Sequence, residues 1–200
     1  MTTKTRSVLC ISHVFIAVLW WAAPLPAGQP TEQIRSAIDR GIGILNRANL
    51  DDKKQNAEVI DRLREVVYPL FDFTEMAKRS LGPQWRRITS QQQEEFVSVF
   101  TRLLEKTYAG RIDLYEGQKV VYRGETIDHN YAQVDTGVIG KNGESYSVVY
   151  KLYLVNGNWR IYDVIAENIS LVNNYRSQFN RVLANSSFED LMNRIREKAS

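Results

Sequence analysis

The sequence predicts an α+β fold in which a four-stranded antiparallel meander sheet is packed against helices from both ends of the chain. Apolar residues recur at helical spacing as far as Gly117 and alternate along the chain after it. Short turn signals such as Asn156-Gly157 separate the alternating runs, and such turns join antiparallel neighbours. Helices, then strands, then helices again indicate a sheet with helices on one face.

Residues 1–27 are typical of a secretory signal peptide. Lys4 and Arg6 precede an apolar run that is shorter than the roughly 20 residues of a membrane-spanning helix. We therefore expect one exported domain at residues 28–200. Removal of the signal also removes Cys10, the one cysteine of the chain, which excludes disulfides and thiolate metal sites.

The charge balance argues against a nucleic-acid-binding protein. The full chain has 26 basic and 23 acidic residues. The signal segment holds two of the basic residues and no acidic one, so the mature domain is close to neutral. Nucleic-acid-binding domains usually carry a strong basic excess, and none is expected here.

Two amphipathic helices are predicted ahead of Pro69. Thr31 is the candidate N-cap of the first. The second should end before Pro69, because the residue that precedes a proline avoids the α region. The apolar stripes of the two helices comprise Ile34, Ala37, Ile38, Ile42 and Leu45, and then Val59, Ile60, Leu63, Val66 and Val67.

Capping patterns predict the next two helices. Asp72 with Glu75 forms a capping-box pattern for a short helix that ends at Gly82. Thr89 or Ser90, followed by glutamines, starts the longest helix of the chain. Its wide apolar stripe comprises Phe96, Phe100, Leu103, Leu104, Tyr108, Ile112 and Tyr115.

Four strands and two closing helices complete the predicted order. Ser170 is the candidate N-cap of a helix that carries Tyr175 and Phe179, and Ser187 with Asp190 caps the last helix. The alternating segments that predict strands are 120–127, 131–139, 146–155 and 159–166.

Asp163 is the strongest candidate for acid–base chemistry. Alternation places it on one face of its strand with Trp159, Ile161 and Ile165, where an unpaired carboxylate would be unfavourable. It would act as the general base of an isomerase or dehydratase. Alternatively, it would accept hydrogen bonds from a tyrosine or from backbone N–H groups at a helix start. No phosphate loop, metal-ligand spacing or nucleophile elbow occurs, and His129 lies in a predicted turn, so we expect no enzyme.

The run from Trp159 to Phe179 resembles the C-terminal signature of the MlaC family. A second block, from Phe71 to Gly110, resembles the central helices of that family in order and spacing. Asn168 stands where the family usually has glycine, at the bend from strand to helix. Asparagine tolerates left-handed φ better than most residues, so we expect the bend to be kept.

The family comprises periplasmic phospholipid-binding proteins, which include toluene-tolerance auxiliary components of an ABC transporter. The resemblance implies an NTF2-like fold around an apolar cavity, with bound phospholipid as cargo and no cofactor or metal. It also implies a periplasmic carrier, expected to be a monomer. Its partners would be an inner-membrane MCE-domain ABC transporter complex and an outer-membrane lipoprotein-porin complex, and its role the maintenance of outer-membrane lipid asymmetry.

The apolar residues of both predicted layers either fill a core or line a pocket, and their pattern alone fits both. A carrier of another apolar ligand, such as a hopanoid or an aromatic compound, fits them equally well. Arg86, Arg87 and Arg176 are candidates to lie near a phosphate. The resemblance implies that the lipid-binding residues are Phe71, Phe73, Met76, Trp85, Phe96, Phe100, Leu103, Leu104, Tyr108, Val134, Val138, Tyr146, Val148, Tyr150, Leu152, Trp159, Ile161, Tyr175 and Phe179.

Overall fold

The computed structural model describes residues 29–48, 53–108 and 115–200, so the expected signal segment lies outside the described residues. Within them, five strands form one antiparallel sheet in the order β1-β2-β3-β4-β5. The strands are β1 (Lys119–Asp128), β2 (Tyr131–Ile139), β3 (Ser145–Val155), β4 (Asn158–Ala166) and β5 (Ile169–Ser170). The helices are α1 (Gln29–Leu45), α2 (Lys53–Val67), η1 (Tyr68–Leu70), α3 (Phe73–Leu81), η2 (Gly82–Arg87), α4 (Ser90–Tyr108), α5 (Leu171–Leu183) and α6 (Phe188–Ala199).

The predicted α+β meander is confirmed, with one strand more than expected. Each of the four long strands lies within one residue of its predicted ends. The turn at Asn156-Gly157 has φ of 50° and 79°, as a type I′ turn requires. Glu167 and Asn168 also have positive φ, 47° and 64°, and turn the chain from β4 into the two-residue β5. Such a short strand leaves no periodic signal in the sequence.

A β-bulge at Tyr162 overturns the predicted faces of β4. Leu152 of β3 pairs with Ile161, whereas its neighbour Lys151 pairs with Asp163, so Tyr162 has no partner in the register. One extra residue in a strand reverses the alternation beyond it. The prediction that Asp163 shares a face with Ile161 is therefore wrong.

The N-terminal capping predictions are partly confirmed. Helix α1 begins at Gln29, so Thr31 lies inside its first turn and is not the N-cap. The Thr31 backbone N–H and hydroxyl instead donate to Glu125 Oε2 of β1, at 2.8 and 2.6 Å. Asp72 caps α3 by accepting the Glu75 N–H at 2.8 Å, while the Glu75 carboxylate binds Lys78 and Arg79 rather than completing a capping box.

The later caps agree with prediction. At the start of α4, the Gln92 side chain accepts the Thr89 backbone N–H, and the Thr89 hydroxyl accepts the Gln92 backbone N–H. Ser170 accepts the Asn173 N–H at 3.0 Å, and Ser187 forms the capping box of α6. Of the stripe predicted for α4, Tyr115 lies beyond the end of the helix, and Ile112 is outside the described residues.

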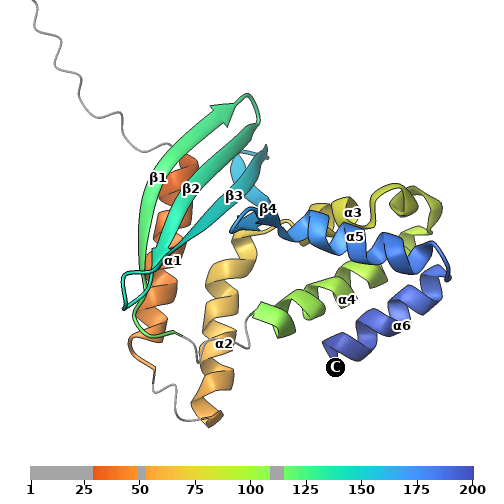
Figure 1. Ribbon diagram of the computed structural model, residues 1–200, viewed down its shortest axis with the longest axis horizontal. Helices are drawn as coiled ribbons and strands as arrows, with labels where there is room; N and C mark the ends of the chain where they lie inside the picture. Colours follow the sequence, from red (N-terminus) through yellow and green to blue (C-terminus); the bar gives the residue numbers. More distant parts are fainter. Residues whose placement is uncertain (1–28, 49–52, 109–114) are drawn as a thin grey trace, which may run out of the picture.

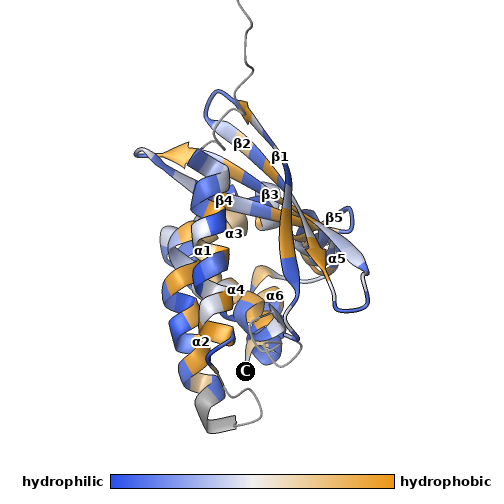
Figure 2. Ribbon diagram, turned by 90° about the vertical axis from the view of Figure 1, so that its left-hand side faces the viewer, coloured by the Kyte–Doolittle hydropathy of each residue, from blue (hydrophilic) through white to orange (hydrophobic). Residues whose placement is uncertain are grey.

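The buried apolar residues of the described helices and strands form two cores. Figure 1 shows the arrangement of the elements that carry them. Helix α1 lies along one face of the sheet, and α3 to α6 gather beyond β4. Apolar and polar residues alternate along α1 and α2, as expected of helices with one inward face (Figure 2). The sheet core comprises Ile34, Ala132, Val134, Leu152, Trp159 and Ile161. The helical core comprises Met76, Ala77, Leu81, Phe96, Val99, Phe100, Leu103, Leu104, Val172, Tyr175, Phe179, Leu191, Met192 and Ile195.

No helix in the described part of the chain is long and apolar enough to cross a membrane.

A candidate apolar ligand cavity

A cavity of about 680 Å³ opens where the two cores meet. This volume lies within the range of roughly 300 to 1,000 Å³ that is usual for small-molecule and cofactor sites. Its walls come from α2, η1, α3, α4, the strands β3, β4 and β5, and the start of α5. The lining residues are Ile60, Leu63, Arg64, Val67, Tyr68, Phe71, Phe73, Met76, Thr101, Leu104, Glu105, Tyr108, Val148, Tyr150, Val164, Ala166, Ile169, Leu171 and Asn174.

Two helices line the cavity with matching stripes. Helix α2 contributes Ile60, Leu63, Arg64 and Val67, which follow the i, i+3, i+4, i+7 spacing of a single helix face. Helix α4 contributes Thr101, Leu104, Glu105 and Tyr108 at the same spacing. Each helix therefore presents one charged residue to the cavity, Arg64 from α2 and Glu105 from α4. Each of the two occupies the i+4 position of its stripe.

The sheet wall depends on the bulge in β4. Val164 pairs with Tyr150, and Ala166 pairs with Val148, and all four side chains line the cavity. Without the extra residue at Tyr162, the alternation would turn Asp163 toward this face instead of Val164. Burial raises the pKa of the Tyr150 phenol, so the neutral form of this wall residue is favoured further.

The mouth of the cavity has an apolar rim. Val67, Tyr108 and Ile169 line the cavity and yet are 37, 51 and 64% exposed. Large apolar side chains that are exposed together beside a cavity are typical of a binding site. The cavity is thus open to solvent where these side chains lie.

Arg64 and Glu105 are the charged residues among the lining residues, and they bind each other. Arg64 Nε donates to Glu105 Oε1 at 2.6 Å, and Nη2 donates to the same oxygen. Arg64 Nη1 donates to Asp61, and the Tyr68 hydroxyl donates to Glu105 Oε2 at 3.0 Å. The hydrogen bond with Glu105 raises the pKa of Arg64, and burial together with Glu105 raises the pKa of Tyr68.

Seven of the 19 predicted lipid-binding residues line this cavity. They are Phe71, Phe73, Met76, Leu104, Tyr108, Val148 and Tyr150. Six others lie in or against the helical core: Trp85, Phe96, Phe100, Leu103, Tyr175 and Phe179. Four lie in the sheet core: Val134, Leu152, Trp159 and Ile161. Val138 and Tyr146 line a separate groove of about 400 Å³ between α1 and the sheet, which Tyr108 also borders.

Ring packing explains why the central aromatic residues of α4 lie outside the cavity wall. The Phe100 ring lies 5.2 Å from that of Tyr175 and 5.7 Å from that of Phe179, both edge to face. Phe96 stacks on Phe100 at 5.8 Å. The apolar stripe predicted for α2 holds Ile60, Leu63 and Val67 but not Arg64, and the sequence reasoning assigns none of these residues to the ligand site. The sequence signal for that role is the i, i+3, i+4, i+7 spacing that the α2 and α4 wall residues share.

The other sequence candidates lie away from the cavity. Asp163 is buried, and its carboxylate accepts the Ser170 hydroxyl at 2.6 Å and the Val172 N–H at 3.0 Å, at the start of α5. Asp163 therefore fits the second of its two predicted roles, that of a hydrogen-bond acceptor for N–H groups at a helix start. Arg176 Nε donates to the Arg79 carbonyl at 2.8 Å, and neither Arg86 nor Arg87 lines the cavity. His129 is exposed in its turn.

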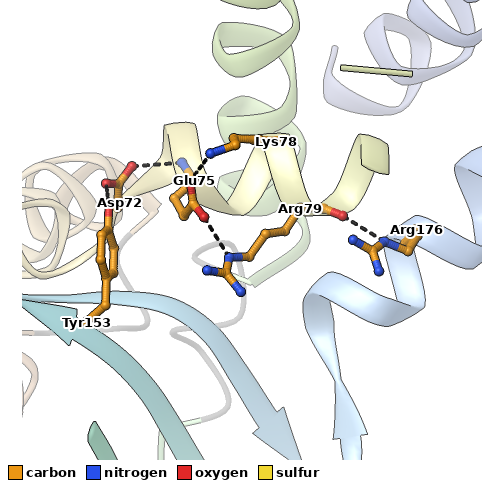
Figure 3. Close-up of polar contacts among 6 residues, drawn as sticks. All are labelled: Asp72, Glu75, Lys78, Arg79, Tyr153 and Arg176. Carbon is orange, nitrogen blue, oxygen red and sulfur yellow. Dashed lines mark hydrogen bonds and ion pairs between the residues drawn. The ribbon is translucent and has the colours of Figure 1, made fainter. Parts of the chain in front are cut away.

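A polar cluster holds α3 against the sheet (Figure 3). Asp72 at the start of α3 accepts a hydrogen bond from the Tyr153 hydroxyl of β3. Glu75 binds Arg79 at 2.8 Å, and the Arg79 guanidinium lies 4.1 Å from the ring centre of Tyr162, the bulged residue. The cluster fixes the segment that carries the cavity residues Phe71, Phe73 and Met76.

Within the described residues, no three or more histidine, cysteine, aspartate or glutamate side chains lie close enough to hold a metal ion.

Comparison with known proteins relates the whole of this architecture to one family. The chain is 22% identical over 196 residues to the intermembrane phospholipid transport system binding protein MlaC of Haemophilus influenzae, covering 95% of this chain and 91% of that protein. It is 28% identical over 170 residues to the toluene tolerance protein ttg2D of Pseudomonas putida, covering 82 and 79% of the two chains.

A solved structure shares the fold. It is that of a phospholipid-binding protein from Ralstonia solanacearum in complex with a phospholipid, with a TM-score of 0.73 and 22% identity, covering 84% of this chain and 95% of that one. The model of the MlaC protein family matches residues 35–197, which include every element lining the cavity. The chain therefore belongs to the MlaC family.

Proposed function

We propose that this protein is a periplasmic phospholipid carrier without catalytic activity. The observation that carries the proposal is the open apolar cavity between the sheet and α2, α3 and α4. The phospholipid in the related Ralstonia solanacearum structure and the transport name of the Haemophilus influenzae relative support it.

The physical requirement for such a carrier is shelter for acyl chains. At about 0.8 kcal/mol per methylene, two ordinary chains represent on the order of 20 kcal/mol of transfer free energy out of water. The walls around Phe71, Leu104 and Val148 would hold the chains, and the rim at Val67, Tyr108 and Ile169 would cover the part nearest the headgroup. The headgroup itself would remain at the mouth, in water.

We further propose that the carrier exchanges cargo with two membrane complexes. One is an inner-membrane MCE-domain ABC transporter complex, and the other is an outer-membrane lipoprotein-porin complex; the exchange would help maintain outer-membrane lipid asymmetry. Residues 1–27 would direct export and be removed, leaving residues 28–200 as one domain. Handover requires that docking change the affinity of the cavity, because a partner that binds loaded and empty states equally cannot move cargo.

The test is the lipid content of the protein purified from the periplasm. Organic extraction and mass spectrometry should yield stoichiometric glycerophospholipid. Val148→Glu, which places a charge in the sheet wall, should abolish co-purification, whereas Val121→Glu should not, because Val121 is 41% exposed and does not line the cavity. An empty wild-type protein that also extracts no lipid from labelled vesicles would overturn the proposal.

The same extraction distinguishes other cargo. If a hopanoid or an aromatic compound is extracted in place of glycerophospholipid, the cavity is still a ligand site, but the cargo of the carrier is a different apolar compound. No observation favours an isomerase or dehydratase that uses Asp163, because this carboxylate already accepts two hydrogen bonds at the start of α5.

A further inference from the structure

Within the described residues, a hydrogen-bonded pair joins two walls of the cavity. Arg64 on α2 and Glu105 on α4 occupy the i+4 position of two facing stripes whose other members border open space. They are 41 residues apart in the chain, so their hydrogen bonds join two separate walls. The Tyr68 hydroxyl binds the second oxygen of Glu105, which fixes the carboxylate from the same side as Arg64.

Helix α2 has few other attachments near the cavity. Of the α2 side chains that the structure describes, Val59 alone is buried, and this helix makes its main contacts with α1 and η1. Its wall residues Leu63 and Val67 face the cavity rather than interlocking with α4. Helices that pack directly interlock their side chains at 8–10 Å between axes. Here the cavity separates the two stripes, so movement of α2 away from α4 would widen it.

The hydrogen bonds of Arg64 argue against a role as a headgroup anchor. Its Nε, Nη1 and Nη2 atoms all donate to carboxylates, two to Glu105 and one to Asp61. One guanidinium thus faces two carboxylates. A phosphate arriving at the mouth would have to displace an existing partner in the presence of excess negative charge.

We propose that the Arg64–Glu105 pair is a latch between α2 and α4 that sets the rate at which apolar cargo enters and leaves the cavity. The proposal rests on the proposed carrier function. The side chains are 38 and 22% exposed, so the pair is partly solvated and weak enough to break. A carrier needs such a contact for two reasons. A cavity that never opened could not release its cargo, and a cavity that never closed would leave the cargo exposed to water.

The experiment measures entry rates for two probes in the secreted, processed protein after its co-purified lipid has been removed. The first probe is N-phenylnaphthylamine, an apolar dye whose fluorescence increases in apolar surroundings, mixed by stopped flow. The second is a pyrene-labelled phosphatidylcholine supplied in phosphatidylcholine vesicles. The variants are Arg64→Gln, Glu105→Gln and the double variant. The matched controls are Arg62→Gln and Glu58→Gln, which break a pair of 2.7 Å on α2 that does not line the cavity.

We expect each single latch variant to accelerate dye entry about two- to fivefold, the range for loss of a partly exposed ion pair. The double variant should be no faster than either single variant, because both changes break one contact. Added salt should accelerate the wild type and not the double variant. The controls should behave as the wild type does.

Unchanged dye entry in both single variants would overturn the latch. Loss of phospholipid at equilibrium in Arg64→Gln, with normal retention in Glu105→Gln, would also overturn it and identify Arg64 as a headgroup anchor. A wild-type protein that admits the dye and takes no phospholipid would contradict the carrier function, while the dye rates would still decide whether the latch exists.

Discussion

The Tyr153 hydroxyl of β3 donates a hydrogen bond to Asp72, the residue that caps α3. The other Asp72 oxygen accepts the Glu75 N–H, and the Asp72 N–H donates to the Ile161 carbonyl of β4. One residue thus joins a helix start to two strands. Because Phe71 and Phe73 flank it and line the cavity, this junction sets the position of the cavity wall.

Replacement of Asp72 should therefore lower the free energy of unfolding by more than the loss of one hydrogen bond would. We expect Asp72→Ala to decrease the free energy of unfolding by about 2–3 kcal/mol, since it removes a cap and leaves the Tyr153 hydroxyl without its acceptor. Tyr153→Phe, the matched control, should lose only about 1 kcal/mol. Urea denaturation measures both. Equal losses in the two variants would mean that the cap contributes nothing.

Tyr122 should make the protein sensitive to high pH. Burial, with repulsion from Asp39, raises the pKa of this phenol to about 12. In the unfolded chain a tyrosine has a pKa of about 10, so the folded state favours the neutral form. The resulting stabilisation is fully present below pH ~10 and is lost as the pH rises through 12. Tyr122→Phe should lose less stability than the wild type between pH 9 and 11.

At neutral pH the same substitution should be neutral or slightly stabilising. Within the described residues, the Tyr122 hydroxyl is buried without a hydrogen-bond partner. Phenylalanine would keep the ring beneath the Arg35 guanidinium, whose centre lies 4.1 Å from the ring centroid. A loss above about 1 kcal/mol in urea denaturation at pH 7 would show that the hydroxyl is bonded in solution.

The parts of the fold that depend on local sequence could be predicted. Asn156-Gly157 requires a turn whatever surrounds it, and Ser170 and Ser187 cap their helices through residues three positions away. The faces of β4 could not be predicted in full, because the bulge at Tyr162 is a property of its pairing with β3. Likewise, Phe100 and Leu104 belong to one apolar stripe and are both buried in the helical core. Only tertiary packing places Leu104 at the cavity wall as well, while the rings of Tyr175 and Phe179 cover Phe100.

Asp163 should affect stability rather than cargo. Asp163→Ala leaves the Val172 N–H and the Ser170 hydroxyl without their acceptor, so we expect a loss of about 2–3 kcal/mol in urea denaturation. Asp163→Asn keeps one acceptor oxygen and should lose less. Phospholipid that co-purifies with either folded variant should equal that of the wild type. Loss of bound lipid from Asp163→Asn at unchanged stability would place this residue in the ligand site.

The contrast between core and wall can be measured with two truncations. Phe100→Ala removes a ring that packs on Tyr175 and Phe179, and we expect it to lower the free energy of unfolding by about 3–5 kcal/mol. Ile60→Ala, in the α2 wall, should lose less than about 2 kcal/mol in the lipid-free protein, because this half-buried side chain already borders open space. With phospholipid bound, the difference between Ile60→Ala and the wild type should grow, since the chain would then fill the cavity and contact Ile60. If Ile60→Ala loses as much as Phe100→Ala without lipid, the cavity is closed in solution, and the wall residues of α2 belong to a packed core.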